Sequence, residues 1–203
     1  EYILDEVADF FKDTDDILFI PYARPGGMTY DEYTAEPREA FRAIGKSVKG
    51  IHEFDDPAEA IRGAKGIFTG GGNTFELLNR LYTQNLREVL REAVQAGTPY
   101  MGSSAGSNIT GLTIGTTNDM PIVYPPSFDA LQLVPFNINP HYLDPDPDSK
   151  HQGETREVRI NEFHHFNEQA VIGIREGSWL RVENGKVELK GKHTARLFQK
   201  GKE

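Results

Sequence analysis

Short apolar runs alternate with helical stripes of apolar residues along the first half of the chain. The runs are bounded by polar residues or glycine, as buried strands are. They lie at 16–23, 48–54, 65–69 and 98–102. Apolar residues recur at helical spacing in five other segments: 3–11, 30–45, 56–64, 74–81 and 87–97. This alternation predicts an α/β fold whose mainly parallel sheet is covered by helices on both faces.

The pattern changes in the last quarter of the chain. Residues 179–189 alternate around Asn184-Gly185, a dipeptide that favours a tight two-residue hairpin turn. Residues 193–200 are expected to add another antiparallel strand. We therefore predict one domain over 1–203, with an antiparallel hairpin at its C-terminal end.

Composition removes several classes of function. The chain has no cysteine, so disulfides, thiolate metal sites and cysteine nucleophiles are excluded. A net charge of −9 argues against nucleic-acid binding, which depends on Lys and Arg at the phosphates. No apolar run approaches the roughly 18 residues of a membrane helix, and the acidic start is unlike a secretory signal. We expect a cytoplasmic protein that binds no membrane, no metal and no cofactor, since metal spacings such as H-E-x-x-H are missing.

A first glycine-rich turn, Gly70-Gly71-Gly72-Asn73, follows a predicted strand at the edge where parallel sheets form their sites. The helix after it presents an N-terminus that favours anions. A Walker phosphate loop is disfavoured because its Lys and Ser/Thr are missing. A structural turn stays open beside the favoured interpretation, a cradle for an oxyanion or a ligand carboxylate. Asn73 is then a candidate substrate-binding residue.

A second turn, residues 102–106, has the sequence GSSAG and matches G-x-S-x-G with Ser104 at its centre. In that motif a nucleophilic serine occupies a sharp strand-to-helix turn, and the next residue donates its N–H to the oxyanion. This register makes Ser104 the candidate nucleophile and Ser103 its neighbour. The pattern is weak by itself, because small residues also form turns that carry no chemistry.

A serine nucleophile needs a base, which is usually histidine held by a carboxylate. His141 ends the strand-like run FNINPH, where a strand end would point into a cleft, but a structural role is equally open from these residues alone. The other histidines are expected in packing (His52), at the polar surface (His164 and His165) or in surroundings without a supporting pattern (His151 and His193).

Nine stretches of the chain resemble the peptidase E family of serine peptidases, the aspartyl dipeptidases related to cyanophycinase. Their order and spacing fit the family pattern with only small gaps. They are IPYA (20–23), DEYT (31–34), GGGNTFELL (70–78), SAGSN (104–108), TTNDMPIV (116–123), FDAL (128–131), INPH (138–141), GETRE (153–157) and EGSWL (176–180). The resemblance implies a fold like that of class I glutamine amidotransferases, with serine in place of their cysteine. It also implies hydrolysis of dipeptides that begin with aspartate.

Carried over residue by residue, the resemblance makes Ser104 the nucleophile and His141 the base. The oxyanion hole would use the backbone N–H groups of Gly72 and Ala105. Removing one such donor typically costs roughly 3 kcal/mol of transition-state stabilisation.

Two carboxylates, Asp119 and Glu176, match family residues credited with completing the triad. Glu176 follows the apolar run AVIGI at a predicted strand end, which favours it as the partner that orients the histidine. Asp119 lies in a polar turn and is kept as an essential site residue.

The resemblance also points to Arg156 as the partner of the substrate's aspartate side chain. A guanidinium binds a carboxylate bidentately, which gives an acidic protein the local cation that an acidic dipeptide requires. The alternative is a surface ion pair, because Glu154 and Glu157 are close in sequence.

The chain departs from the family pattern in two places. Ser103 stands where family members often carry Trp or another large residue. The chain also starts where family members enter their first helix, so we expect the native N-terminal strand to be missing. Two other functions stay open, a peptidase of β-aspartyl or cyanophycin-like substrates and a non-catalytic small-molecule binding module. A homodimer is a further expectation.

Overall fold

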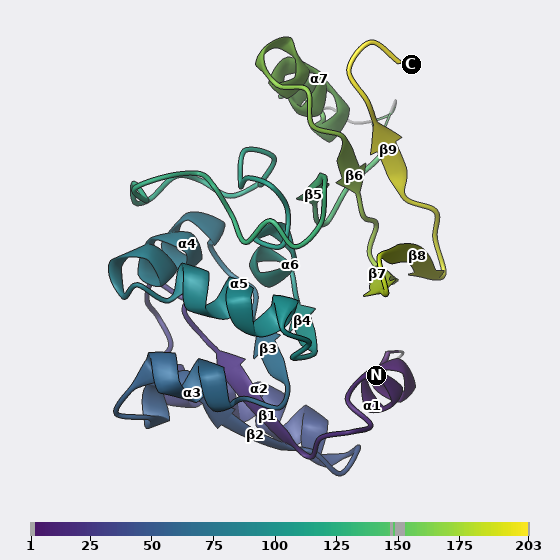
Figure 1. Ribbon diagram of the computed structural model, residues 1–203. Coiled ribbons are helices and arrows are strands. Elements are labelled where there is room, and N and C mark those ends of the chain that lie inside the picture. Colours follow the sequence, from purple (N-terminus) through teal and green to yellow (C-terminus); the bar gives the residue numbers. More distant parts are fainter. Residues whose placement is uncertain (1–2, 147, 149–152, 203) are drawn as a thin grey trace.

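Figure 1 shows the computed structural model, which describes residues 3–146, 148 and 153–202. The first half of the chain forms a parallel sheet with strand order β2-β1-β3-β4. Its strands are β1 (Asp16–Ile20), β2 (Ser47–Gly50), β3 (Ile67–Thr69) and β4 (Tyr100–Gly102). β1 lies inside the sheet, because it pairs with β2 on one side and with β3 on the other. The predicted parallel sheet is confirmed.

Helices cover both faces of this sheet. They are α1 (Leu4–Phe10), α2 (Tyr30–Arg42), α3 (Pro57–Gly63), α4 (Thr74–Thr83) and α5 (Arg87–Gln95). Successive side chains of a strand point to opposite faces. Ile17 and Phe19 accordingly pack with residues of α1 and α2, whereas Leu18 and Ile20 pack with residues of α3, α4 and α5.

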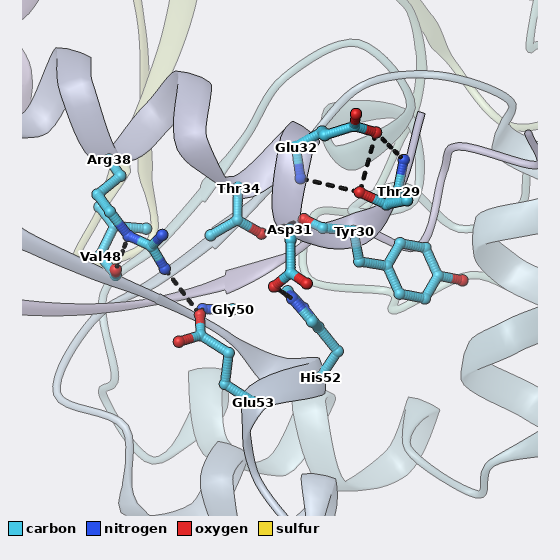
Figure 2. A network of polar contacts seen from close by, with 10 residues as sticks. All are labelled: Thr29, Tyr30, Asp31, Glu32, Thr34, Arg38, Val48, Gly50, His52 and Glu53. Atoms are coloured by element: carbon cyan, nitrogen blue, oxygen red, sulfur yellow. Dashed lines mark hydrogen bonds and ion pairs between the residues drawn. The ribbon is translucent and has the colours of Figure 1, made fainter. Parts of the chain in front are cut away.

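The segment expected as a strand over 48–54 is strand only as far as Gly50. A short 3₁₀ helix, η1 (Ile51–Glu53), follows and takes the chain out of the sheet. Figure 2 shows the polar contacts at this point: the Glu53 carboxylate accepts from Gly50 N–H, and His52 Nε2 lies 3.0 Å from Asp31 Oδ1. These side-chain contacts compete with strand pairing, and periodicity alone does not reveal them.

The second half of the chain forms separate sheets rather than extending the first. β5 (Asn137–Asn139), β6 (Val171–Gly173) and β9 (Arg196–Phe198) make a sheet in which β5 and β6 are parallel and β9 is antiparallel to β6. The expected hairpin is confirmed as β7 (Ser178–Glu183) and β8 (Lys186–Gly191). Its turn residues, Asn184 and Gly185, have φ of 51° and 75°, as a type I′ turn requires.

Two further helices belong to this half, α6 (Ala105–Asn108) and α7 (Arg156–Phe166). The hairpin is joined to the N-terminal helix by Arg181, whose guanidinium pairs with Glu6 at 2.8 Å and with Asp9 at 2.7 Å. The hydrogen bond from Arg181 holds the pKa of the Glu6 carboxyl below its usual value. Among the described residues, no helix combines the length and apolar character needed to cross a bilayer.

Candidate active site

Ser104 occupies a sharp turn between β4 and α6, as the G-x-S-x-G pattern predicts. Its backbone has φ of 51° and ψ of −109°, a conformation that is strained for a residue with a side chain. The flanking glycines are sterically required: a Cβ at Gly102 would lie 2.2 Å from the Gly106 carbonyl oxygen, and one at Gly106 would lie 2.2 Å from that of Thr69. The strained turn is the geometry of a nucleophile elbow.

His141 and Glu176 stand beside Ser104 because they follow two paired strands. β5 and β6 are parallel and in register from Asn137 to Asn139, so the chain leaves both strands at the same edge. His141 Nε2 lies 2.8 Å from Ser104 Oγ, and His141 Nδ1 contacts Glu176 Oε1. Serine, histidine and glutamate are therefore linked in series, as in a catalytic triad.

This triad is open to solvent. The side chains of His141 and Glu176 are 51% and 71% exposed, respectively. His141 also has a positive φ of 54°, which is uncommon for a residue other than glycine. The peptide unit that joins Pro140 to His141 is held by Asn118, whose side-chain amide donates to the Pro140 carbonyl at 2.6 Å.

Asp119 does not contact the histidine. Its Oδ2 accepts from the Thr74 N–H at 2.7 Å, at the start of α4, and lies 3.1 Å from Thr117 Oγ1. Of the two carboxylates that the sequence left open, Glu176 is thus the one that lies on His141. Asp119 instead links its own turn to the start of α4, directly after the glycine turn at 70–73.

The turn at 70–73 lies against the elbow. A Cβ placed on Gly71 would be 3.0 Å from Ser104 Cβ. Gly72 has φ of 139°, and a Cβ there would lie 2.3 Å from the Ala23 carbonyl oxygen, so only glycine fits. Within the described part of the chain, the N–H groups of Gly72 and Ala105 have no hydrogen-bond acceptor. Two unpaired donors next to a serine are suited to stabilise an oxyanion.

Asn73 uses both ends of its side chain within the protein. Its Oδ1 caps α4 by accepting from the Glu76 N–H at 3.1 Å, and its Nδ2 donates to the Met120 carbonyl at 2.9 Å. The structure therefore places Asn73 where it shapes the glycine turn. Direct contact with a substrate stays a prediction.

Arg156, the first residue of α7, lines a cavity of about 40 Å³ together with Thr116, Asn118, Asn139 and Phe163. It makes no hydrogen bond or ion pair with any described residue, so the surface ion pair considered from the sequence is not formed. Burial and the neighbouring Arg159 lower the pKa of Arg156, and the charge of Asp119 opposes this shift. A half-buried, unpaired guanidinium is suited to bind a carboxylate.

None of the other described histidines forms a hydrogen bond with Ser104. His52 contacts Asp31 from η1 (Figure 2). His164 was expected at the surface, but it is 6% exposed and lies 3.0 Å from the Gln169 carbonyl oxygen. It and His165 are on α7, whose helical pattern the sequence analysis missed because the segment has no clear apolar stripe. The expectation for His151 falls outside the described residues.

Comparison with known proteins shows that this chain is similar to peptidases of one family. The chain is 52% identical over 201 residues to a peptidase E from Streptomyces coelicolor, covering 99% of this chain and 82% of the relative. It is 48% identical over 202 residues to a Drosophila melanogaster protein named "Probable alpha-aspartyl dipeptidase", covering 98% and 83%. A crystal structure of a candidate peptidase E protein from Listeria monocytogenes shares the fold, with a TM-score of 0.73, 23% identity and coverage of 95% and 94%. The profile of peptidase family S51 matches residues 1–190, and the chain belongs to this family.

Proposed function

We propose that the protein is a serine dipeptidase that hydrolyses dipeptides with an N-terminal aspartate. The observation that carries this proposal is the series of contacts from Ser104 Oγ through His141 to Glu176, together with the Arg156 guanidinium, which has no hydrogen-bond or ion-pair partner among the described residues. The names of the two relatives, peptidase E and alpha-aspartyl dipeptidase, agree with it.

In the proposed mechanism, Ser104 Oγ attacks the carbonyl carbon of the scissile bond while His141 Nε2 takes the hydroxyl proton. Glu176 accepts from His141 Nδ1–H, which fixes the tautomer and stabilises the imidazolium that forms. The carbonyl oxygen becomes an oxyanion and accepts from the N–H groups of Gly72 and Ala105. His141 then gives its proton to the leaving amine, and water releases the aspartyl group from Ser104.

Two charges of opposite sign would hold the substrate. Arg156 binds the aspartate side chain bidentately in its cavity. Asp119 has one carboxylate oxygen engaged with Thr74 and Thr117 and lies within electrostatic reach of Arg156. Its other oxygen is suited to accept from the substrate's α-ammonium group. Such a pair of contacts favours a free N-terminal aspartate over an aspartate inside a longer chain.

Turnover of Asp-Leu compared with Asn-Leu, Ala-Leu, Glu-Leu and β-Asp-Leu tests this function. We expect clear preference for Asp-Leu, because Arg156 leaves part of its donor fork unpaired when the carboxylate is replaced by an amide or removed. N-acetyl-Asp-Leu should be a poor substrate, because acetylation removes the charge that faces Asp119. Cleavage of β-Asp-Leu alone would transfer the same chemistry to isoaspartyl bonds and contradict the α-dipeptidase proposal.

The roles of the two carboxylates are separable by kinetics. Glu176→Gln is expected to lower kcat for Asp-Leu about 10⁴-fold with little change in KM, because the amide no longer fixes the histidine tautomer or stabilises the imidazolium. Asp119→Asn is expected to act mainly through KM, raising it about tenfold, since a neutral amide binds the ammonium group weakly. Steady-state kinetics of the two variants, matched as carboxylate-to-amide changes, measure both effects. The opposite assignment, with kcat lost in Asp119→Asn and unaffected in Glu176→Gln, would exchange their roles.

A further inference from the structure

A side chain from another element contacts the middle of the glycine turn. Tyr33, on α2, is 6% exposed, and its hydroxyl donates to the Gly71 carbonyl at 2.8 Å. Burial raises the pKa of Tyr33, so the phenol stays protonated and able to donate. The mechanism above does not use this residue.

The hydrogen bond from Tyr33 to the Gly71 carbonyl also affects the N–H group of the same peptide unit. A trans peptide unit is planar, and its C=O and N–H groups point in opposite directions. The Gly71 C=O and the Gly72 N–H belong to one such unit. Fixing this carbonyl on Tyr33 therefore also fixes the direction of the Gly72 N–H, which has no acceptor among the described residues.

The turn needs such a contact because residues 70–72 are all glycine, which gives the backbone wide conformational freedom. Its ends are anchored by two backbone bonds, from the Gly70 N–H to the Ile20 carbonyl at 3.1 Å and from the Asn73 N–H to the Ala23 carbonyl at 2.7 Å. Neither bond sets the plane of the peptide in the middle. A Cβ on Gly70 would lie 2.5 Å from the Tyr33 hydroxyl oxygen, so glycine there permits the close approach.

Tyr33 is held by a firmly attached helix. Figure 2 shows α2 starting with a reciprocal capping box, in which Thr29 and Glu32 each accept from the other's backbone N–H. Arg38, further along α2, donates to the Val48 carbonyl at 3.1 Å and pairs with Glu53 at 2.8 Å. These contacts attach the helix to β2 itself, through Val48, and to η1, through Glu53.

The Tyr33 ring is fixed as well. It meets Phe19 edge to face at a centroid distance of 5.2 Å, and the Arg24 guanidinium lies 4.7 Å from its centroid. A ring held from two sides presents its hydroxyl in one direction, so little conformational entropy is lost when the hydrogen bond forms.

We propose that Tyr33 is a positioning residue for the oxyanion hole. By holding the Gly71 carbonyl, it aims the Gly72 N–H at the oxyanion that forms when Ser104 attacks. The inference rests on the proposed serine mechanism. It does not depend on which dipeptide is the substrate.

Tyr33→Phe tests the inference, because it removes one hydroxyl and keeps the ring. Tyr22→Phe is the matched control: Tyr22 is also buried, and its hydroxyl bonds to Gln84 at 3.1 Å rather than to the glycine turn. Two rates are measured for each variant, kcat for Asp-Leu and the labelling of Ser104 by a fluorophosphonate. In the labelling reaction the Ser104 oxygen forms a bond to phosphorus and fluoride leaves, while the phosphoryl oxygen occupies the oxyanion hole.

We expect both rates to fall about tenfold in Tyr33→Phe, with KM changed by less than about twofold. Complete loss of an oxyanion donor costs about 10²–10³ in kcat, and here the donor persists but is less well aimed. Tyr22→Phe should leave both rates at the wild-type value. Unchanged labelling in Tyr33→Phe would overturn the inference, as would an equal loss in both variants, which would indicate general loosening of the core.

The labelling arm also separates this inference from the substrate proposal. If the wild-type protein labels at Ser104 but does not hydrolyse Asp-Leu, the substrate proposal fails and the two labelling rates still decide the role of Tyr33. If the wild-type protein does not label, the serine mechanism and the role of Tyr33 are both rejected.

Discussion

Replacing Ser104 by alanine is expected to lower kcat/KM for Asp-Leu about 10⁴–10⁶-fold, the range typical of losing a triad nucleophile. The reason is chemical: without Oγ no aspartyl-enzyme forms, and His141 has no proton to take. Binding contacts stay in place, so the dissociation constant of Asp-Leu, measured by calorimetry on the inactive variant, should be within a few-fold of the wild-type KM. Steady-state turnover and intact-mass detection of the fluorophosphonate adduct measure the loss.

Ser103→Ala is the matched control, since it deletes the same atom from the adjacent residue. Ser103 is exposed and its backbone supports the turn, with its N–H donating to the Thr69 carbonyl at 3.0 Å and its carbonyl accepting from the Gly106 N–H at 2.9 Å. Alanine preserves both backbone bonds, so activity and labelling should stay within about twofold of wild type. Labelling that survives in Ser104→Ala and disappears in Ser103→Ala would identify Ser103 as the nucleophile and contradict the assignment of Ser104.

Replacing Arg156 by alanine is expected to lower kcat/KM for Asp-Leu about 10³-fold while the slow turnover of Ala-Leu changes little. Removing one partner of a buried, hydrogen-bonded charge pair costs about 2–5 kcal/mol, and each 1.4 kcal/mol is a factor of ten. Arg156 has no described hydrogen-bond or ion-pair partner in the protein, so its loss should disturb binding more than folding. Kinetics on the two dipeptides, with thermal unfolding as a check, give the comparison.

Arg156→Lys refines this prediction. Lysine keeps the positive charge but is a point donor without the planar fork, so we expect it to recover only part of the preference for Asp-Leu over Ala-Leu. If Arg156→Ala reduced the turnover of Asp-Leu and Ala-Leu by the same factor, the residue would have no part in side-chain selection.

Local signals explain why much of the fold was predictable. Asp56 before Pro57 begins α3, and the Asp56 carboxylate accepts from the first backbone N–H groups of that helix. Asn184-Gly185 supplies two left-handed residues in a row, which only a tight hairpin turn requires. Such signals depend on residues near one another in the chain, so they can be interpreted without knowing the tertiary structure.

Some local interpretations failed where the pattern was weak or tertiary contacts dominated. The strand expected through His52 stops at Gly50, where a 3₁₀ helix begins. The Glu53 carboxylate accepts from the Gly50 N–H, and His52 contacts Asp31. α7 was missed because its apolar residues do not form a clear stripe, and the burial of His164 was missed with it.

The sequence by itself determined the parallel α/β framework, the strained elbow at Ser104 and the set of residues from which a triad could be drawn. Only the tertiary structure decided that Glu176, and not Asp119, lies on His141, because that contact depends on the parallel pairing of β5 with β6. It also decided that Arg156 has no described protein partner and that Tyr33 holds the Gly71 carbonyl. The physical reason is the same for the two contacts: residues 35 or 38 positions apart meet only after strands pair and helices pack, and no local pattern encodes such meetings.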